Sequence, residues 1–485
     1  MIRILPLSIL LLLPFCSFGE MTNDAVARAT AAVEAATPRA QSDPSHPIFH
    51  VASPAQWMND PNGPIFYKGF YHLFYQLNPF SDGDGPKHWG HVRSRDLVKW
   101  ERLPIALWPS TEAGESGVWS GCCTVNGRGE PMIFYTSVAQ GKSAFDHAEQ
   151  WAATSDDDLI HWKKSPANPV LSEELHGGTK VYDWRDPFIF REGKKTFLVA
   201  GGHLAKQGRA AVNIYEAENP ELTKWTYRGV LFQLPDNMPT AECPNFFKID
   251  HQWVLFVSPY NHVQYFTGDF DAATCRFTPH TQGTLDYGSF YAPNTMQIPD
   301  GRRLVWGWIN GFPGGRGWNG CLSLPRQLSI SREGQLQQQP APQLSQLRGK
   351  QSEWRNLHLE TQPAPLPLPK TNTLEIRAVL DLGKPGLVQL KIKSGAENAS
   401  PILISFNGNE LAVMDTQAPL EIETGQKLTL RIFIDRSVLE VFANDTACIT
   451  KVIVPLGANP TLELHTEGGP VTAERIQAWS MRTIW

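Results

Sequence analysis

The feature that most constrains the fold of this 485-residue chain is a strand–turn–strand unit that recurs along its N-terminal part. Short apolar runs alternate with turn residues, and no long amphipathic helical pattern interrupts them. Units of this form start at Gly63, Asp186, Pro244 and Pro293, and the second half of one starts at Glu130. Five units at a spacing of roughly 50–65 residues predict a β-propeller of four-stranded blades around a central channel. We place this domain at residues 46–335.

An acidic residue stands beside a proline and an apolar strand at three junctions between these units. A single Asp-Pro-Asn-Gly is usually only a turn, because Gly supplies a positive φ and Asn bonds its own backbone. Recurrence at equivalent places of a radial fold instead predicts that three carboxylates converge at one end of the channel. The junctions are Trp57-Met58-Asn59-Asp60-Pro61-Asn62-Gly63, Arg185-Asp186-Pro187-Phe188 and Glu242-Cys243-Pro244-Asn245-Phe246.

These three motifs, in this order, resemble those of glycoside hydrolase family 32, the retaining β-fructosidases, and the resemblance extends from Pro47 to the C-terminus. It implies an all-β chain, with a five-bladed β-propeller followed by a C-terminal β-sandwich. It also implies that Asp60 is the nucleophile, Glu242 the acid/base and Asp186 a stabiliser of the transition state. Retaining hydrolysis requires two carboxyl groups about 5–5.5 Å apart. The residues that resemble the family's substrate-binding set are Trp57, Asn59, Gln76, Trp89, Trp119, Ser120, Arg185 and Trp306.

The resemblance leads us to expect a secreted exo-acting hydrolase that removes terminal β-D-fructofuranosyl residues from levan, inulin or sucrose without a cofactor. Asn245 stands where plant invertases carry an acidic residue that helps to hold glucose, so a preference for fructan over sucrose is predicted. Two alternatives stay open, namely a fructosyltransferase that uses the same residues and a fructan-binding relative without catalysis. An α-L-arabinofuranosidase of a related propeller family is disfavoured by the intact motif from Trp57 to Gly63.

The first 19 residues have the pattern of a secretory signal. Arg3 precedes an apolar run from Leu5 to Pro14, and Ser17-Phe18-Gly19 resembles a cleavage site. The run is too short to span a membrane. Lipid attachment at Cys16 is disfavoured, because the residues before it are not small. We therefore expect a secreted or periplasmic protein, with residues 20–45 as a mobile spacer.

Composition argues against other classes of partner. The net charge of −5 and the absence of a basic block make nucleic acid an unsuitable partner. Six cysteines follow Cys16, which is sparse for a disulfide scaffold, and no spacing typical of metal ligands occurs, so no metal is expected. No sequence feature specifies an oligomeric state.

The C-terminal part is predicted to be a separate β-domain over residues 355–485. Residues 336–354 begin with a Gln- and Pro-rich stretch and are predicted to be a linker. Alternating apolar runs at Leu374–Leu380 and Leu428–Ile434 indicate antiparallel strands. Asp435 and Glu440 are predicted to lie on a surface turn and strand of the sandwich rather than in a second active site.

Overall fold

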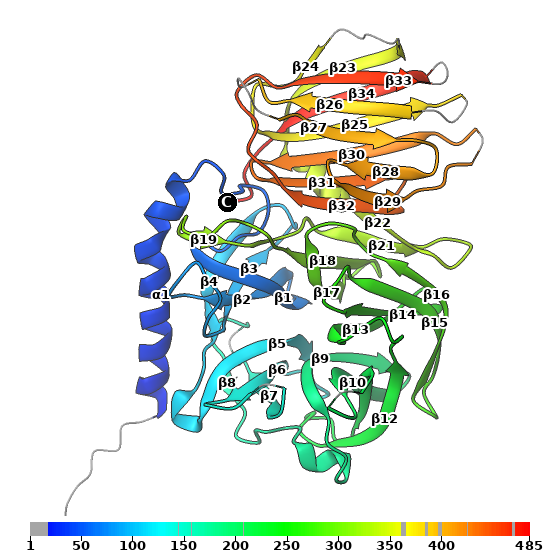
Figure 1. Cartoon of the computed structure of the whole chain (residues 1–485). Helices are drawn as coiled ribbons and strands as arrows, with labels where there is room; N and C mark the ends of the chain where they lie inside the picture. Colours follow the sequence, from blue (N-terminus) through cyan, green and yellow to red (C-terminus); the bar gives the residue numbers. More distant parts are fainter. Residues whose placement is uncertain are drawn as a thin grey trace, which may run out of the picture.

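The computed structural model describes residues 18–485, apart from residues 144, 157, 207 and 424 and segments 360–364, 384–386, 396–399 and 468–470. The chain forms two β-domains stacked end to end, with one long helix, α1 (Phe18–Ser42), along the side of the first domain (Figure 1). The predicted all-β propeller followed by a β-sandwich is confirmed. No helix among the described residues is both long and apolar enough to cross a membrane.

Five sheets, antiparallel except for one short strand described below, form the blades of the propeller. In each blade the first strand in chain order is innermost, and these inner strands contact one another in a ring around the channel. The first two blades comprise β1 (Gln56–Tyr67), β2 (Phe70–Asn78), β3 (His88–Ser94) and β4 (Trp100–Leu107), then β5 (Glu115–Val125), β6 (Pro131–Ala139), β7 (Ala148–Thr154) and β8 (Lys163–Lys164). The next two comprise β9 (Tyr182–Glu192), β10 (Lys195–His203), β11 (Ala210–Ala217) and β12 (Trp225–Gln233), then β13 (Glu242–Ile249), β14 (Gln252–Ser258), β15 (Gln264–Asp271) and β16 (Arg276–Thr284). The fifth comprises β17 (Phe290–Gln297), β18 (Arg303–Ile309), β21 (Arg326–Ile330) and β22 (Leu336–Pro340).

The fifth blade is tied to the first through the segment between β18 and β21. Within it, β19 (Trp318–Asn319) pairs in parallel with the start of β1, where Trp318 lies opposite Gln56. The next short strand, β20 (Cys321–Leu322), returns to β18. One segment therefore hydrogen-bonds to both blades and closes the ring.

The inner strands bulge at one level, and the bulges coincide with a recurring residue–proline pair. The residue before the proline has a positive φ in four inner strands, namely Gly63 (46°), Asp186 (61°), Cys243 (46°) and Ala292 (47°). Strand pairing shifts register at the same places. This conformation costs on the order of 1 kcal/mol for a residue other than Gly, and a bulge re-aims the side chains beside it. In these four inner strands, the residue that precedes the positive-φ residue therefore lies in an equivalent place.

The sandwich consists of two six-stranded sheets whose facing sides form one apolar core. The apolar runs alternate as predicted, for example in β25, where Leu374, Ile376 and Ala378 are buried. One sheet holds β23 (Arg348–Leu359), β34 (Val471–Met481), β25 (Thr373–Asp381), β30 (Leu428–Asp435), β31 (Val438–Ala443) and β32 (Ala447–Val452). The other holds β24 (Leu366–Pro367), β33 (Thr461–Glu467), β26 (Leu387–Lys393), β27 (Ile402–Phe406), β28 (Glu410–Val413) and β29 (Thr416–Pro419).

The predicted linker at 336–354 is wrong, because both of its ends are strands. β22 is the outer strand of the fifth blade, and β23 already belongs to the sandwich. Only a short 3₁₀ turn, η3 (Pro342–Leu347), separates them. A Gln-rich segment can form a strand when a neighbour such as β21 supplies its ladder hydrogen bonds.

The predicted mobile spacer at 20–45 is also wrong, because α1 covers most of it and packs against the propeller. Val33 and Ala40 are buried in the same apolar cluster as residues of the first and last blades. At its C-terminal end Asp43 Oδ2 accepts a hydrogen bond of 2.8 Å from Trp318 Nε1. Alanine favours a helix and permits close approach to a surface, which explains the docking. Residues 1–17, most of the expected signal, lie outside the described residues.

The propeller and sandwich meet through a network of fully buried charges. Arg326 Nη2 contacts Glu440 Oε2 at 2.6 Å, and its Nη1 contacts Asp286 Oδ2 at 3.0 Å. His50 lies between two carboxylates, with Nδ1 2.9 Å from Asp435 Oδ2 and Nε2 2.9 Å from Glu440 Oε1. The predicted surface position of Asp435 and Glu440 is therefore wrong, since packing against the propeller buries both.

Candidate active site

Asp60 lies in β1, near the start of the strand, and both of its carboxylate oxygens accept hydrogen bonds. Asn59 Nδ2 donates to Oδ1 at 3.1 Å, and Ser120 Oγ donates to Oδ2 at 2.5 Å. Gln76 holds both donors, because its Oε1 accepts from Asn59 Nδ2 at 2.6 Å and its Nε2 donates to Ser120 Oγ at 2.6 Å. Trp57 Nε1 donates to Asn59 Oδ1 at 3.0 Å. Four of the predicted site residues thus orient a fifth, Asp60.

Glu242 is the first residue of β13 and is held from two sides. Arg185 Nη2 lies 2.8 Å from its Oε1, and the Tyr291 hydroxyl donates to its Oε2 at 2.5 Å. Burial raises the pKa of Glu242 to about 7; Arg185 acts against this, and the negative charge of Asp186 adds to it. Because Arg185 is also paired with Asp183 at 3.0 Å, its charge is shared between carboxylates.

Asp186 completes the acid cluster from β9. Its Oδ2 accepts the backbone N–H of Cys243 at 2.8 Å. The Cys243 Sγ lies 3.6 Å from Oδ2 of Asp186 and 3.6 Å from Oδ2 of Asp60, immediately beside Glu242 in sequence. Burial raises the pKa of Asp186 to about 6; Arg185 opposes this and Asp60 supports it. The structure therefore brings the three predicted acids together from three inner strands.

Known proteins resemble this chain both in sequence and in fold. Residues 50–340 match the family description "Glycosyl hydrolases family 32 N-terminal domain", and residues 343–480 match its C-terminal counterpart. The chain belongs to glycosyl hydrolase family 32.

Relatives within family 32 cover most of the chain. A levanase of Bacillus subtilis is 32% identical over 90% of this chain and 71% of its own length. A sucrose-6-phosphate hydrolase of Zymomonas mobilis is 33% identical over 82% of this chain and 84% of its own length. Among solved structures, a Bombyx mori β-fructofuranosidase in complex with sucrose superimposes with a TM-score of 0.82 at 26% identity, over 95% of this chain and 99% of the other. This chain is accordingly a glycoside hydrolase.

The four tryptophans that resemble family 32 binding residues divide into two pairs. Trp57 and Trp119 are half-buried near the acids, and the Arg185 guanidinium lies 5.5 Å from the Trp119 ring. Trp89 and Trp306 are fully buried in apolar clusters. The expectation that these last two line the substrate pocket is wrong for this structure, because packing between strands covers their rings.

Asn245 does not face the space around the acids. It is buried, and its Nδ2 donates to the backbone oxygens of Cys243 at 3.2 Å and Pro293 at 3.0 Å. Its Oδ1 accepts the Thr295 N–H at 3.0 Å. Since these bonds tie β13 to β17, Asn245 is not placed to contact a glucosyl unit, and the preference for fructan over sucrose stays a prediction.

Sequence reasoning missed several members of the site. Tyr291 precedes Ala292-Pro293 as Glu242 precedes Cys243-Pro244, so the repeated residue–proline pair was the signal that could have found it. Lys87 is buried, with Nζ 5.4 Å from the Trp57 ring and an ion pair to Asp84. Burial lowers the pKa of Lys87 to about 8, and the nearby Asp60 partly offsets this. No motif marked Lys87. The other members missed are Asp183 and Tyr260, which both contact Arg185.

No group of three or more His, Cys, Asp or Glu side chains within the described part of the chain is arranged to hold a metal ion. All six cysteines after Cys16 are free thiols.

Proposed function

We propose that this chain is an exo-acting retaining β-fructosidase that hydrolyses terminal β-D-fructofuranosyl residues of sucrose or fructans. The observation that carries the proposal is the cluster of three carboxyl groups, in which Glu242 alone contacts both a guanidinium and a phenol. The names of the relatives, levanase and sucrose-6-phosphate hydrolase, support the substrate class. The signal-like residues 1–19 support export from the cell.

Asp60 is the nucleophile in this proposal. Its two oxygens are held by Asn59 and Ser120, which fixes the direction of attack on the anomeric carbon. Glu242 donates its proton to the glycosidic oxygen as the bond to the anomeric carbon breaks, and the leaving sugar or chain departs as an alcohol. The product of this step is a fructosyl ester of Asp60.

The second step restores the enzyme. Glu242, now a carboxylate, takes a proton from water, and the water oxygen attacks the anomeric carbon and releases Asp60. A pKa of about 7 suits Glu242 to both steps, since the group must be protonated first and ionised later. Asp186 and Arg185 lie where they would hold fructosyl hydroxyls, and the half-exposed Trp57 and Trp119 would border the sugar.

The stereochemistry of the first-formed product tests the retaining mechanism. NMR within seconds of mixing is expected to show fructose with the β configuration of the substrate, and the inverted anomer would contradict the assignment. Azide is expected to restore turnover of an activated aryl fructoside by Glu242→Ala, because azide needs no general base. Asp60→Ala is the matched variant: azide takes the place of the missing nucleophile and should give a fructosyl azide of inverted configuration, whereas Glu242→Ala should give the retained azide. Sizing the products formed from concentrated sucrose separates hydrolysis from fructosyl transfer.

A further inference from the structure

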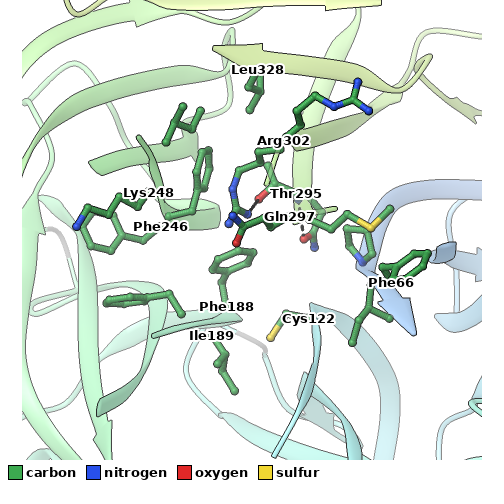
Figure 2. A pocket seen from close by; sticks show the side chains of 18 of the residues that line it. Phe66, Cys122, Phe188, Ile189, Phe246, Lys248, Thr295, Gln297, Arg302 and Leu328 are labelled. Carbon is green, nitrogen blue, oxygen red and sulfur yellow. Dashed lines mark hydrogen bonds between the residues drawn. The ribbon is translucent and has the colours of Figure 1, made fainter. Parts of the chain in front are cut away.

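A chamber of about 1000 Å³ lies at the end of the propeller channel away from the acids. Figure 2 shows side chains that line it. All five inner strands line it with residues that follow the bulge level, such as 63–66 of β1 and 188–191 of β9. Asn294 of β17 separates it from the acids, because its Nδ2 reaches across to the Gly121 backbone oxygen of β5 at 3.0 Å. A Cβ on Gly63 would lie only 2.9 Å from Cys123 Cβ, so the strands nearly touch at this level.

The wall of this chamber is divided between apolar and basic side chains. Figure 2 shows Phe66, Phe188 and Phe246 around the cavity, with Arg302 and Lys248 at its sides. Six charged residues line the chamber. They are Arg191, Lys248, Arg302 and Arg303, against Asp250 and Asp300. Four basic and two acidic groups leave a local surplus of positive charge in a protein whose net charge is −5.

Two of the four basic groups are already neutralised. Arg302 is paired with Asp300, and Lys248 Nζ lies 3.5 Å from Glu192 Oε1. Their charges are therefore balanced within the protein.

Arg303 is the exception that points to a ligand. Its guanidinium lies 4.4 Å from the Phe247 ring, and Nη1 donates to Thr295 Oγ1 at 3.0 Å. Among the described residues no carboxylate forms an ion pair with it, and its Nε is buried without a hydrogen-bond partner. Burial lowers the pKa of Arg303 to about 9. A buried charge without a counter-charge is costly, whereas a guanidinium already fixed in position loses little entropy on binding an anion.

Arg191 lies on another wall of the same chamber and also contacts only neutral groups. Its Nη1 donates to Thr124 Oγ1 at 3.3 Å and its Nη2 to the Val125 backbone oxygen at 2.5 Å. No carboxylate in the described part of the chain forms an ion pair with Arg191 either. Two guanidinium groups from different blades thus line one cavity without an ion pair, against one remaining lining carboxylate, Asp250.

We propose that this chamber is a binding site for a tetrahedral oxyanion, either free or carried as a phosphate monoester on a small organic molecule. Arg303 supplies a half-buried charge and a planar set of donors, and Arg191 supplies a second, exposed charge. The phenylalanines border the space that an organic group would occupy. The site is separate from the three acids and does not depend on the fructosidase assignment.

Calorimetric titration and thermal melts of the whole protein with inorganic phosphate and with glucose 6-phosphate test this site, with sodium chloride at equal ionic strength as reference. Saturable binding and a higher melting temperature are expected. Arg303→Gln should lose affinity about tenfold or more, the usual consequence of removing one partner of a buried charge pair. Arg302→Gln, whose charge is already balanced, is the matched control and should change affinity less than about threefold.

The two ligands distinguish a site for a free oxyanion from a site for a phosphate carried on an organic molecule. Equal binding of both identifies a site for the oxyanion alone, and tighter binding of glucose 6-phosphate identifies an organic phosphate. Circular dichroism reports folding of each variant, and Arg191→Gln, at an exposed position, provides a second test if Arg303→Gln does not fold. A wild-type response no larger than that to chloride would overturn the proposal, as would Arg303 and Arg191 variants that bind phosphate like the wild type.

Discussion

Two clusters of buried charge in this molecule use the same residue types in opposite ways. At the acid end of the channel, Arg185 acts on Glu242 and Asp186 and Lys87 lies near Asp60, while burial raises the pKa of Glu242 to about 7. At the domain interface, burial also acts on Glu440, but the positive charges of Arg326 and His50 outweigh it and lower its pKa.

The carboxylates of the two clusters also differ in the hydrogen bonds that they accept. Asp435 accepts the backbone N–H groups of Ile48, Phe49 and His50 at 2.7–3.0 Å. At the acid end, an excess of carboxylates faces space that substrate can enter. Each interface carboxylate has a cation as a close partner, whereas burial keeps Glu242 at the acid end partly protonated, and its proton is available for transfer.

The largest effect on activity is predicted for replacing a carboxylate of the acid cluster by its amide. Glu242→Gln and Asp60→Asn should each lower kcat/KM for sucrose by roughly three orders of magnitude or more, because each removes a group that reacts. Their melting temperatures should stay within a few degrees of the wild type, since removal of one of several repelling carboxylates does not destabilise. Steady-state kinetics and thermal melts measure both; a large fall in melting temperature would make these residues structural.

Glu440→Gln, the matched change at the interface, should lower the stability of the protein and leave its activity nearly unchanged. It leaves Arg326 and His50 with less counter-charge, and breaking a buried pair costs about 3–5 kcal/mol. Urea unfolding is expected to show this loss, while kcat/KM of the remaining folded protein stays near wild type. Arg302→Gln, in an exposed pair with Asp300, should cost less than about 1 kcal/mol. Similar losses of unfolding free energy in Glu440→Gln and Arg302→Gln would contradict the predicted difference between the buried and the exposed ion pair.

The interface should also make stability depend on pH through His50. Burial opposes the charge of His50, but hydrogen bonds and ion pairs to Asp435 and Glu440 prevail and raise its pKa from 6.5 to about 9. A folded-state pKa above the unfolded value means that this contribution is complete below pH 6.5 and is lost as the pH rises through 9. Urea unfolding between pH 6 and 9.5 measures the slope, which His50→Gln should flatten. An equal slope in both proteins would show that another group is responsible.

The smallest effect is predicted for Tyr291→Phe. The Tyr291 hydroxyl donates to Glu242 and so favours its ionised form. Its removal should raise the pKa of Glu242 and move the alkaline limb of the kcat/KM profile upward by roughly one pH unit, the equivalent of one hydrogen bond to a charged group. A profile that moves downward or stays in place would contradict the assigned direction of this contact.

Sequence patterns predicted what depends on local order and on repetition. The residue–proline junctions predicted that Asp60, Asp186 and Glu242 meet at one end of the channel, and alternation of apolar residues predicted the strands of both domains. Features that depend on packing between distant segments were not predictable. Trp89 and Trp119 are the same residue type and are joined by a hydrogen bond, yet only the contacts between strands decide that one is fully buried and the other half-exposed.

The same limit applies outside the site. An Ala-rich segment becomes a docked helix only because the propeller offers α1 a surface. A Gln-rich segment becomes β22 only because β21 is its neighbour. Glu440 is buried only because the sandwich packs against β20 and β21, where the Leu324 N–H also donates to it at 2.7 Å.

The pH profile of Glu242 variants tests whether Glu242, whose pKa burial raises to about 7, is the proton donor. Measured with sucrose, the wild-type kcat/KM should fall with an apparent pKa near 7 as Glu242 ionises. Measured with an aryl fructoside whose leaving group needs no proton, Glu242→Gln should keep activity and lose this alkaline limb. An alkaline limb near pH 7 that persists in Glu242→Gln would assign the proton to another group and contradict the account.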